Sequence, residues 1–89
     1  MPRCEGWRNY ETWSVALHIN NDQSSYHHWR RRAVQLLRGR ETRLALADEL
    51  KETFESEAPD LGATCYADLL NAGLSEVDWL EIADSLLRR

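Results

Sequence analysis

NYETWSVALHINNDQSSYHHWRRRAVQLLR, residues 9–38, is a stretch in which two helices are predicted. Its apolar side chains recur at helical spacing, and the polar run at residues 20–22 separates a first helix, at about residues 10–20, from a second, at about residues 24–38. The apolar residues of the first helix form two stripes on nearly opposite sides: Tyr10, Trp13, Ala16 and Leu17, and then Val15 and Ile19. A helix that is apolar on most sides is expected between other helices, so we expect this one at the centre of the fold.

The remaining residues predict three more helices, at about residues 43–57, 63–72 and 76–87. Asn9 is the expected N-cap of the first helix and Thr42 that of the third, and Gly73 is the expected end of the fourth. A capping box formed by Ser75 and Asp78 is expected to start the fifth. The predicted fold class is all-α, a single compact domain of about five short helices at residues 9–89. A loosely ordered segment is expected at residues 1–8.

Charge is distributed unevenly along the 89 residues. Residues 1–43 carry eight arginines and four acidic residues, and therefore a net charge of +4. Residues 44–89 carry eleven acidic and three basic residues, and therefore a net charge of −8. This predicts a strongly bipolar domain, and the overall isoelectric point near 5.3 argues against a general DNA-binding protein.

The sequence contains no recognisable catalytic or metal-binding motif. The three histidines lack the H-x-x-x-H spacing of metal ligands, and Cys4 and Cys65 belong to no C-x-x-C pair. The N-terminus lacks the apolar core of a signal peptide, and no apolar run approaches the roughly 20 residues of a membrane span. We therefore expect a cytoplasmic protein with reduced thiols, no cofactor, no membrane association and no enzymatic activity.

Two blocks of the sequence are distinctive. The opening block is NYETW at residues 9–13 with VAL at residues 15–17, and the closing block is ADLL at residues 67–70 with LSEVDWLEIA at residues 74–83. In these blocks the chain resembles a family of small uncharacterised helical proteins encoded by bacteriophages, plasmids and integrated elements. The resemblance covers residues 9–87 and implies an origin on a mobile element, but it brings no activity. The arginine-rich connection at residues 38–43 departs from the family pattern.

Acidic residues recur on the expected outer faces of the third and fifth helices. They are Asp48, Glu49, Glu52 and Glu55 in the third helix and Asp78, Glu81 and Asp84 in the fifth. If the two helices are adjacent, both rows face solvent together and imitate the charge of duplex DNA at lower density. Together with the mobile-element origin that the resemblance implies, these acidic faces lead to our first hypothesis, a non-enzymatic inhibitor of a host defence system that occupies a basic groove. The expected partner is a host protein or nucleoprotein complex, such as a DNA-targeting nuclease or a CRISPR effector. The plain alternative is a solvated acidic surface.

An alternative binding site is basic and aromatic. Its members are Trp7, Arg8, Arg30, Arg31, Arg38, Arg40 and Arg43. Arginine neutralises phosphate, so this set indicates a small nucleic-acid-binding regulator, unless the arginines simply pair with the acidic half of the chain. Trp7 is either a lid over the core or an exposed anchor for a partner. A third hypothesis is a structural module whose charge asymmetry drives head-to-tail self-association, and we expect a monomer or a weak homodimer.

Overall fold

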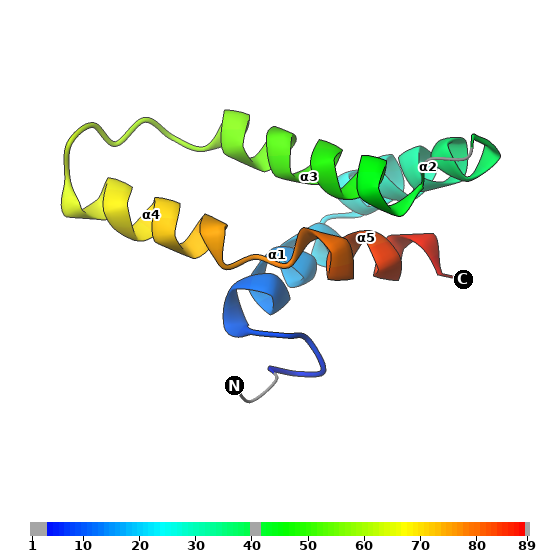
Figure 1. Ribbon diagram of the computed structural model, residues 1–89, viewed down its shortest axis with the longest axis horizontal. Helices are drawn as coiled ribbons and strands as arrows, with labels where there is room; N and C mark the ends of the chain where they lie inside the picture. The colour runs from blue at the N-terminus through cyan, green and yellow to red at the C-terminus, as the bar shows by residue number, and fades with distance from the viewer. Residues whose placement is uncertain (1–3, 40–41, 89) are drawn as a thin grey trace.

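A computed structural model describes residues 4–39 and 42–88 and contains five α-helices (Figure 1). The helices are α1 at Tyr10–Asn21, α2 at Gln23–Arg38, α3 at Arg43–Glu57, α4 at Cys65–Ser75 and α5 at Trp79–Leu87. Within the described residues there is no strand, and one isolated antiparallel bridge joins Cys4 to Trp7. The prediction of an all-α single domain is therefore confirmed, and each helix lies within a few residues of its expected position.

The core of the molecule is built around α5, the shortest helix. α5 packs most extensively against α3, and it also contacts α2 and α1. The buried residues of α5 are Trp79, Ile82, Ala83 and Leu86. They join one buried cluster with apolar side chains from α1, α2 and α3. Removal of this apolar surface from water is the main favourable contribution to folding, so α5 is the helix on which the fold depends most.

α1 is not the central helix, contrary to the prediction. It packs mainly against α2 and α5 and buries a single face, formed by Thr12, Ala16 and Ile19. Tyr10 and Leu17, which belong to one of the predicted apolar stripes, are 63% and 40% exposed. This buried face lies between the two predicted apolar stripes. It includes Ala16 from one stripe and Ile19 from the other. Helical spacing places residues on a common face, but it does not determine which face a neighbouring helix covers.

α4 extends away from the core. None of its residues is buried, and Tyr66 and Leu69 are each 69% exposed. Figure 1 shows α4 and the 58–64 connection at one end of the molecule, with the C-terminal end of α2 at the other. The apolar residues of α4 are therefore largely uncovered, although their spacing is typical of a helix that packs on a core.

Side-chain oxygens cap the first turns of four helices. The capping residues are Asn9 for α1, Asp22 for α2, Thr64 for α4 and Asp78 for α5. Each accepts a hydrogen bond from the backbone N–H three residues later, which satisfies a donor that has no partner within the helix. The predicted cap of α1 is confirmed. Thr42 makes no capping bond to α3, because its backbone is helical and not in the extended conformation that a cap requires.

The junction between α4 and α5 differs from the prediction. Gly73 lies inside α4, which continues to Ser75, and the Ser75 hydroxyl donates to the carbonyl of Ala72 instead of capping α5. Asp78 takes the capping position and accepts a hydrogen bond of 3.1 Å from the N–H of Glu81. A carboxylate interacts more favourably than a neutral hydroxyl with the positive end of a helix, which is consistent with a start three residues later.

Candidate binding surface

The carboxylates of α5 are held by arginines from elsewhere in the chain. Arg43, the first residue of α3, donates two hydrogen bonds to Asp84, from Nε to Oδ1 and from Nη2 to Oδ2, both 2.9 Å long. Two parallel bonds of this kind make the strongest and most directional arginine–carboxylate pair. The hydrogen bonds to Asp84, and then its negative charge, raise the pKa of Arg43 above its usual value. Asp84 therefore joins α5 to α3.

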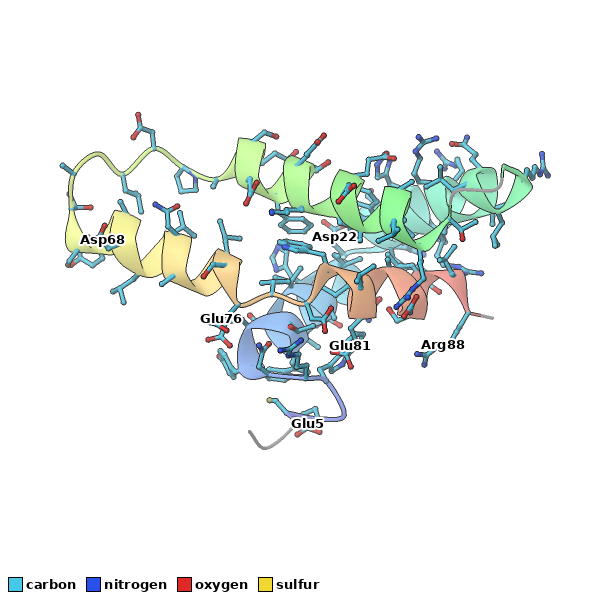
Figure 2. The ribbon with its side chains drawn as sticks, viewed as in Figure 1. Glu5, Asp22, Asp68, Glu76, Glu81 and Arg88 are labelled. Atoms are coloured by element: carbon cyan, nitrogen blue, oxygen red, sulfur yellow. The ribbon has the colours of Figure 1, made fainter. Side chains whose placement is uncertain are left out.

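The N-terminal segment binds the start of α5 in a similar way. Nη1 of Arg8 lies 3.4 Å from Oδ2 of Asp78, and the backbone N–H of Arg8 donates to Oε1 of Glu81 at 2.8 Å. Figure 2 shows Glu81 beside this segment. Acidic residues also suit this end of the helix because its unpaired N–H groups carry partial positive charge. All three carboxylates of the predicted α5 row therefore have partners within the chain.

This arrangement corrects the predicted acidic site. The α3 and α5 rows do not face solvent together, because α5 is central and its polar side lies along its contacts with α3 and the N-terminal segment. Glu49 is engaged as well, since Nε of Arg32 donates to its two oxygens at 2.7 and 2.9 Å. This hydrogen bonding, and then the charge of Glu49, raises the pKa of Arg32. Four of the seven predicted residues therefore connect parts of the fold to one another.

Three carboxylates of the predicted α3 row are left for a partner: Asp48, Glu52 and Glu55. All three are exposed, and within residues 4–39 and 42–88 they have no ion-pair partner. At about 100° per residue they fall within an arc of about 60°, on the side of α3 opposite the buried Leu46 and Leu50. We call these three residues the acidic face.

The acidic face leads into a stretch of the chain without cations. Residues 52–87 contain nine acidic residues and no lysine, arginine or histidine. Glu57, Asp60 and Asp68 are exposed, and Figure 2 shows Asp68 towards the far end of α4. Asp78 and Asp84 are paired with arginine side chains, and Glu81 accepts a hydrogen bond from the backbone N–H of Arg8. The exposed acidic residues of this stretch therefore lie mainly on α3, the 58–64 connection and α4.

Arg30, from the predicted basic site, has a structural contact. Its Nη1 donates to the backbone oxygens of Leu86 and Arg88, the latter at 2.8 Å. The last carbonyl groups of a helix have no partner within the helix, so a cation at this position satisfies them and interacts favourably with the helix dipole. Arg30 therefore holds the C-terminal turn of α5 against α2.

The rest of the predicted basic site divides into internal and exposed members. Arg31 and Arg38 are exposed and have no ion-pair or hydrogen-bond partner in the part of the chain that the structure describes. Trp7 is partly buried against the core, as a lid would be, and Arg40 lies outside the described residues. Pairing with the acidic half of the chain, the plainer interpretation of the arginine cluster, is confirmed for Arg8 and Arg43, whereas Arg30 binds backbone oxygens instead of a carboxylate.

Replacing Arg30 with methionine tests its role at the end of α5. We expect the free energy of unfolding to fall by about 1–2 kcal/mol, because two carbonyl groups lose a charged donor while the apolar stem of the side chain is kept. Arg31→Met is the matched control and should stay within about 0.5 kcal/mol of the wild type, since Arg31 is exposed and unpaired. Urea denaturation measures both, and equal losses would contradict the capping role.

The described residues also bear on metal binding, disulfide formation and membrane insertion. In the described ranges, no group of three or more histidine, cysteine, aspartate or glutamate side chains is placed to hold a metal ion. Cys4 and Cys65 are both free thiols. No helix among the described residues has the length and apolar character needed to cross a membrane.

Comparison with known proteins assigns the chain to a family. The chain matches no curated protein and no solved structure. A model of a family of unknown function, DUF7249, matches residues 3–70, a range that includes α1, α2, α3 and the opening NYETW block. Of the closing block, ADLL at residues 67–70 lies at the end of the matched range, and the stretch at residues 74–83 lies beyond it. Because the match covers about three quarters of the 89 residues, the protein belongs to this family of unknown function.

Proposed function

We propose that this protein is a non-enzymatic binding protein of a mobile genetic element that acts in the cytoplasm by protein–protein contact. Its acidic face binds a positively charged groove on a host protein or nucleoprotein complex and thereby inhibits a host defence system. The partner that fits best is a DNA-targeting enzyme, such as a nuclease or a CRISPR effector. One observation carries the proposal: Asp48, Glu52 and Glu55 are exposed on one side of α3 without a paired cation in the described chain.

The charge of the acidic face suits a groove that normally holds nucleic acid. Its carboxylates rise along α3 in steps of about 6 and 4.5 Å, whereas duplex DNA carries one charge per roughly 1.7 Å. The acidic face is therefore a sparser version of the phosphate backbone, extended by the exposed Glu57 and Asp60. Such complementarity raises the association rate and orients the partner. The proposal requires α3 and the connection after it, and it no longer includes the α5 row.

Affinity capture from a host lysate tests the proposal. The triple variant Asp48→Asn/Glu52→Gln/Glu55→Gln removes the charge of the acidic face with little change in side-chain shape. We expect the wild type to capture a DNA-processing complex and the triple variant to lose it, with mass spectrometry as the readout. The matched control, Arg31→Gln/Arg38→Gln, neutralises exposed charges on α2 and should capture the complex like the wild type. Capture of the same complex by the triple variant would contradict the proposal.

The same experiment distinguishes the acidic-face proposal from the alternative, which is nucleic-acid binding through arginines. Arg31 and Arg38 are the two arginines of that site that are exposed and unpaired in the described chain. Two phosphate contacts predict a slope of only about −1.8 for the logarithm of affinity against the logarithm of salt concentration. Capture of DNA or RNA by the wild type and the triple variant, with loss in Arg31→Gln/Arg38→Gln, would replace the acidic-face proposal with this alternative.

A further inference from the structure

An apolar groove of about 290 Å³ lies between α1 and α4. Its walls include Tyr10 and Val15 from α1 and Leu69, Leu70 and Leu74 from α4. Tyr10 and Leu69 are 63% and 69% exposed, and a contiguous patch of such side chains is a common mark of an interaction site. The volume lies just below the range of about 300–1,000 Å³ for small-molecule sites. The groove therefore suits a few side chains of a protein better than a small ligand.

Carboxylates lie beside this groove. Glu11 is one of its lining residues. Glu76 follows α4 next to the start of α1, where its backbone oxygen accepts a 2.7 Å hydrogen bond from Nδ2 of Asn9 (Figure 2). Neither carboxylate is ion-paired within the residues that the structure describes. An occupant that satisfies this groove must therefore offer apolar side chains flanked by positive charge.

The outer side of α2 has this composition. Tyr26, Val34 and Leu37 are 37%, 41% and 50% exposed, and they lie next to the unpaired Arg31 and Arg38. At about 100° per residue these five side chains occupy an arc of about 140° on α2. They extend over about 18 Å of helix, and α4 is about 16 Å long. We call these five residues the α2 strip.

We propose that the groove between α1 and α4 binds the α2 strip of a second copy of the chain. The apolar side chains of the strip enter the groove, and its two arginines approach Glu11 and Glu76. The two surfaces lie on different parts of one molecule, with α4 and the C-terminal end of α2 at opposite ends (Figure 1). The contact is therefore head-to-tail, and it builds open chains instead of a closed dimer. This self-association goes beyond the proposed host binding, which uses the acidic face.

Two variants, each with one surface disabled, test the proposal. Leu69→Glu places a negative charge in the groove, and Leu37→Glu places one in the α2 strip. Both leucines are at least half exposed, so the fold tolerates the changes. At low salt the average mass of the wild type should rise continuously with protein concentration, whereas each variant alone should stay monomeric. An equimolar mixture should form a heterodimer of twice the monomer mass and grow no further, because each variant keeps the surface that the other lacks.

Leu44→Glu is the matched control for this experiment. Leu44 is 67% exposed and lines a different groove, beside Arg8 and Asp78, so this variant should assemble like the wild type. Analytical ultracentrifugation measures the masses, and salt at about 1 M, where the Debye length is about 3 Å, should weaken the assembly. The proposal is overturned if the wild type stays monomeric up to millimolar concentration. It is also overturned if the equimolar mixture of Leu69→Glu and Leu37→Glu stays monomeric, as each variant does alone. All these variants keep the acidic face, so the outcome is independent of host binding.

Discussion

Replacing Ile82 with alanine is expected to lower the free energy of unfolding by about 2–5 kcal/mol. Ile82 is 1% exposed and lies on α5, which contacts α1, α2 and α3, so movement of a single neighbour cannot fill the cavity. The total stability expected for a domain of this length is only about 4–13 kcal/mol. The substitution therefore removes a large share of it, and the melting temperature should fall by at least about 8 °C. Thermal and urea denaturation followed by circular dichroism measure both quantities.

The controls for this prediction are leucines on α1 and α4. Leu17→Ala and Leu69→Ala each remove as many carbon atoms as Ile82→Ala, but Leu17 is 40% exposed and Leu69 is 69% exposed. We expect losses below about 1.5 kcal/mol for Leu17→Ala and within about 0.5 kcal/mol for Leu69→Ala. If Leu17→Ala cost more than Ile82→Ala, α1 and not α5 would be the central helix.

Replacing Thr12 with valine is expected to lower the free energy of unfolding by about 2–3 kcal/mol. Thr12 is fully buried, and its hydroxyl donates to Oδ1 of Asn9 at 2.6 Å and accepts from the N–H of Asp78 at 2.8 Å. Nδ2 of Asn9 in turn donates to the carbonyl of Glu76. These hydrogen bonds join the start of α1 to the link between α4 and α5. Valine keeps the shape of threonine but leaves the partly buried N–H of Asp78 without a partner.

The variant Thr12→Ser distinguishes the contribution of the Thr12 hydrogen bonds to stability from the contribution of its packing. Serine keeps the hydroxyl and loses one methyl group, so we expect a loss of only about 1 kcal/mol by urea denaturation. The serine variant should therefore be more stable than the valine variant, although valine is closer to threonine in volume. The opposite order would show that Thr12 acts through packing and not through the bonds to Asn9 and Asp78.

Much of the fold was predictable because its signals are local. Apolar residues at helical spacing, together with the polar break at residues 20–22 and the Asn9 cap, predicted five helices close to their observed positions. The central place of α5 was not predictable from such signals. Tyr10 and Leu17 have the same spacing as a buried stripe, yet both are exposed. Burial depends on which helices meet, and that is a property of the whole chain.

The candidate site was likewise predictable only where it depends on local sequence signals. The outward position of Asp48, Glu52 and Glu55 follows from helical periodicity and was predicted correctly, whereas Glu49 is bound by Arg32. The pairing of Asp84 with Arg43 and of Glu81 with Arg8 was not predicted, because these partners are 41 and 73 residues apart. The buried hydroxyl of Thr12 was missed for the same reason, since its partner Asp78 lies 66 residues away. No local pattern records such distant contacts.

The affinity of the captured partner for the acidic face is the most direct test of the central claim. The purified partner would be titrated with the wild type and with Asp48→Asn/Glu52→Gln/Glu55→Gln, in the presence and absence of duplex DNA. If each carboxylate contributes on the order of 1 kcal/mol to binding, the triple variant should bind on the order of 100-fold more weakly. Duplex DNA should compete with the wild type. Equal affinity of the two proteins, or simultaneous binding of DNA and the wild type, would contradict the claim.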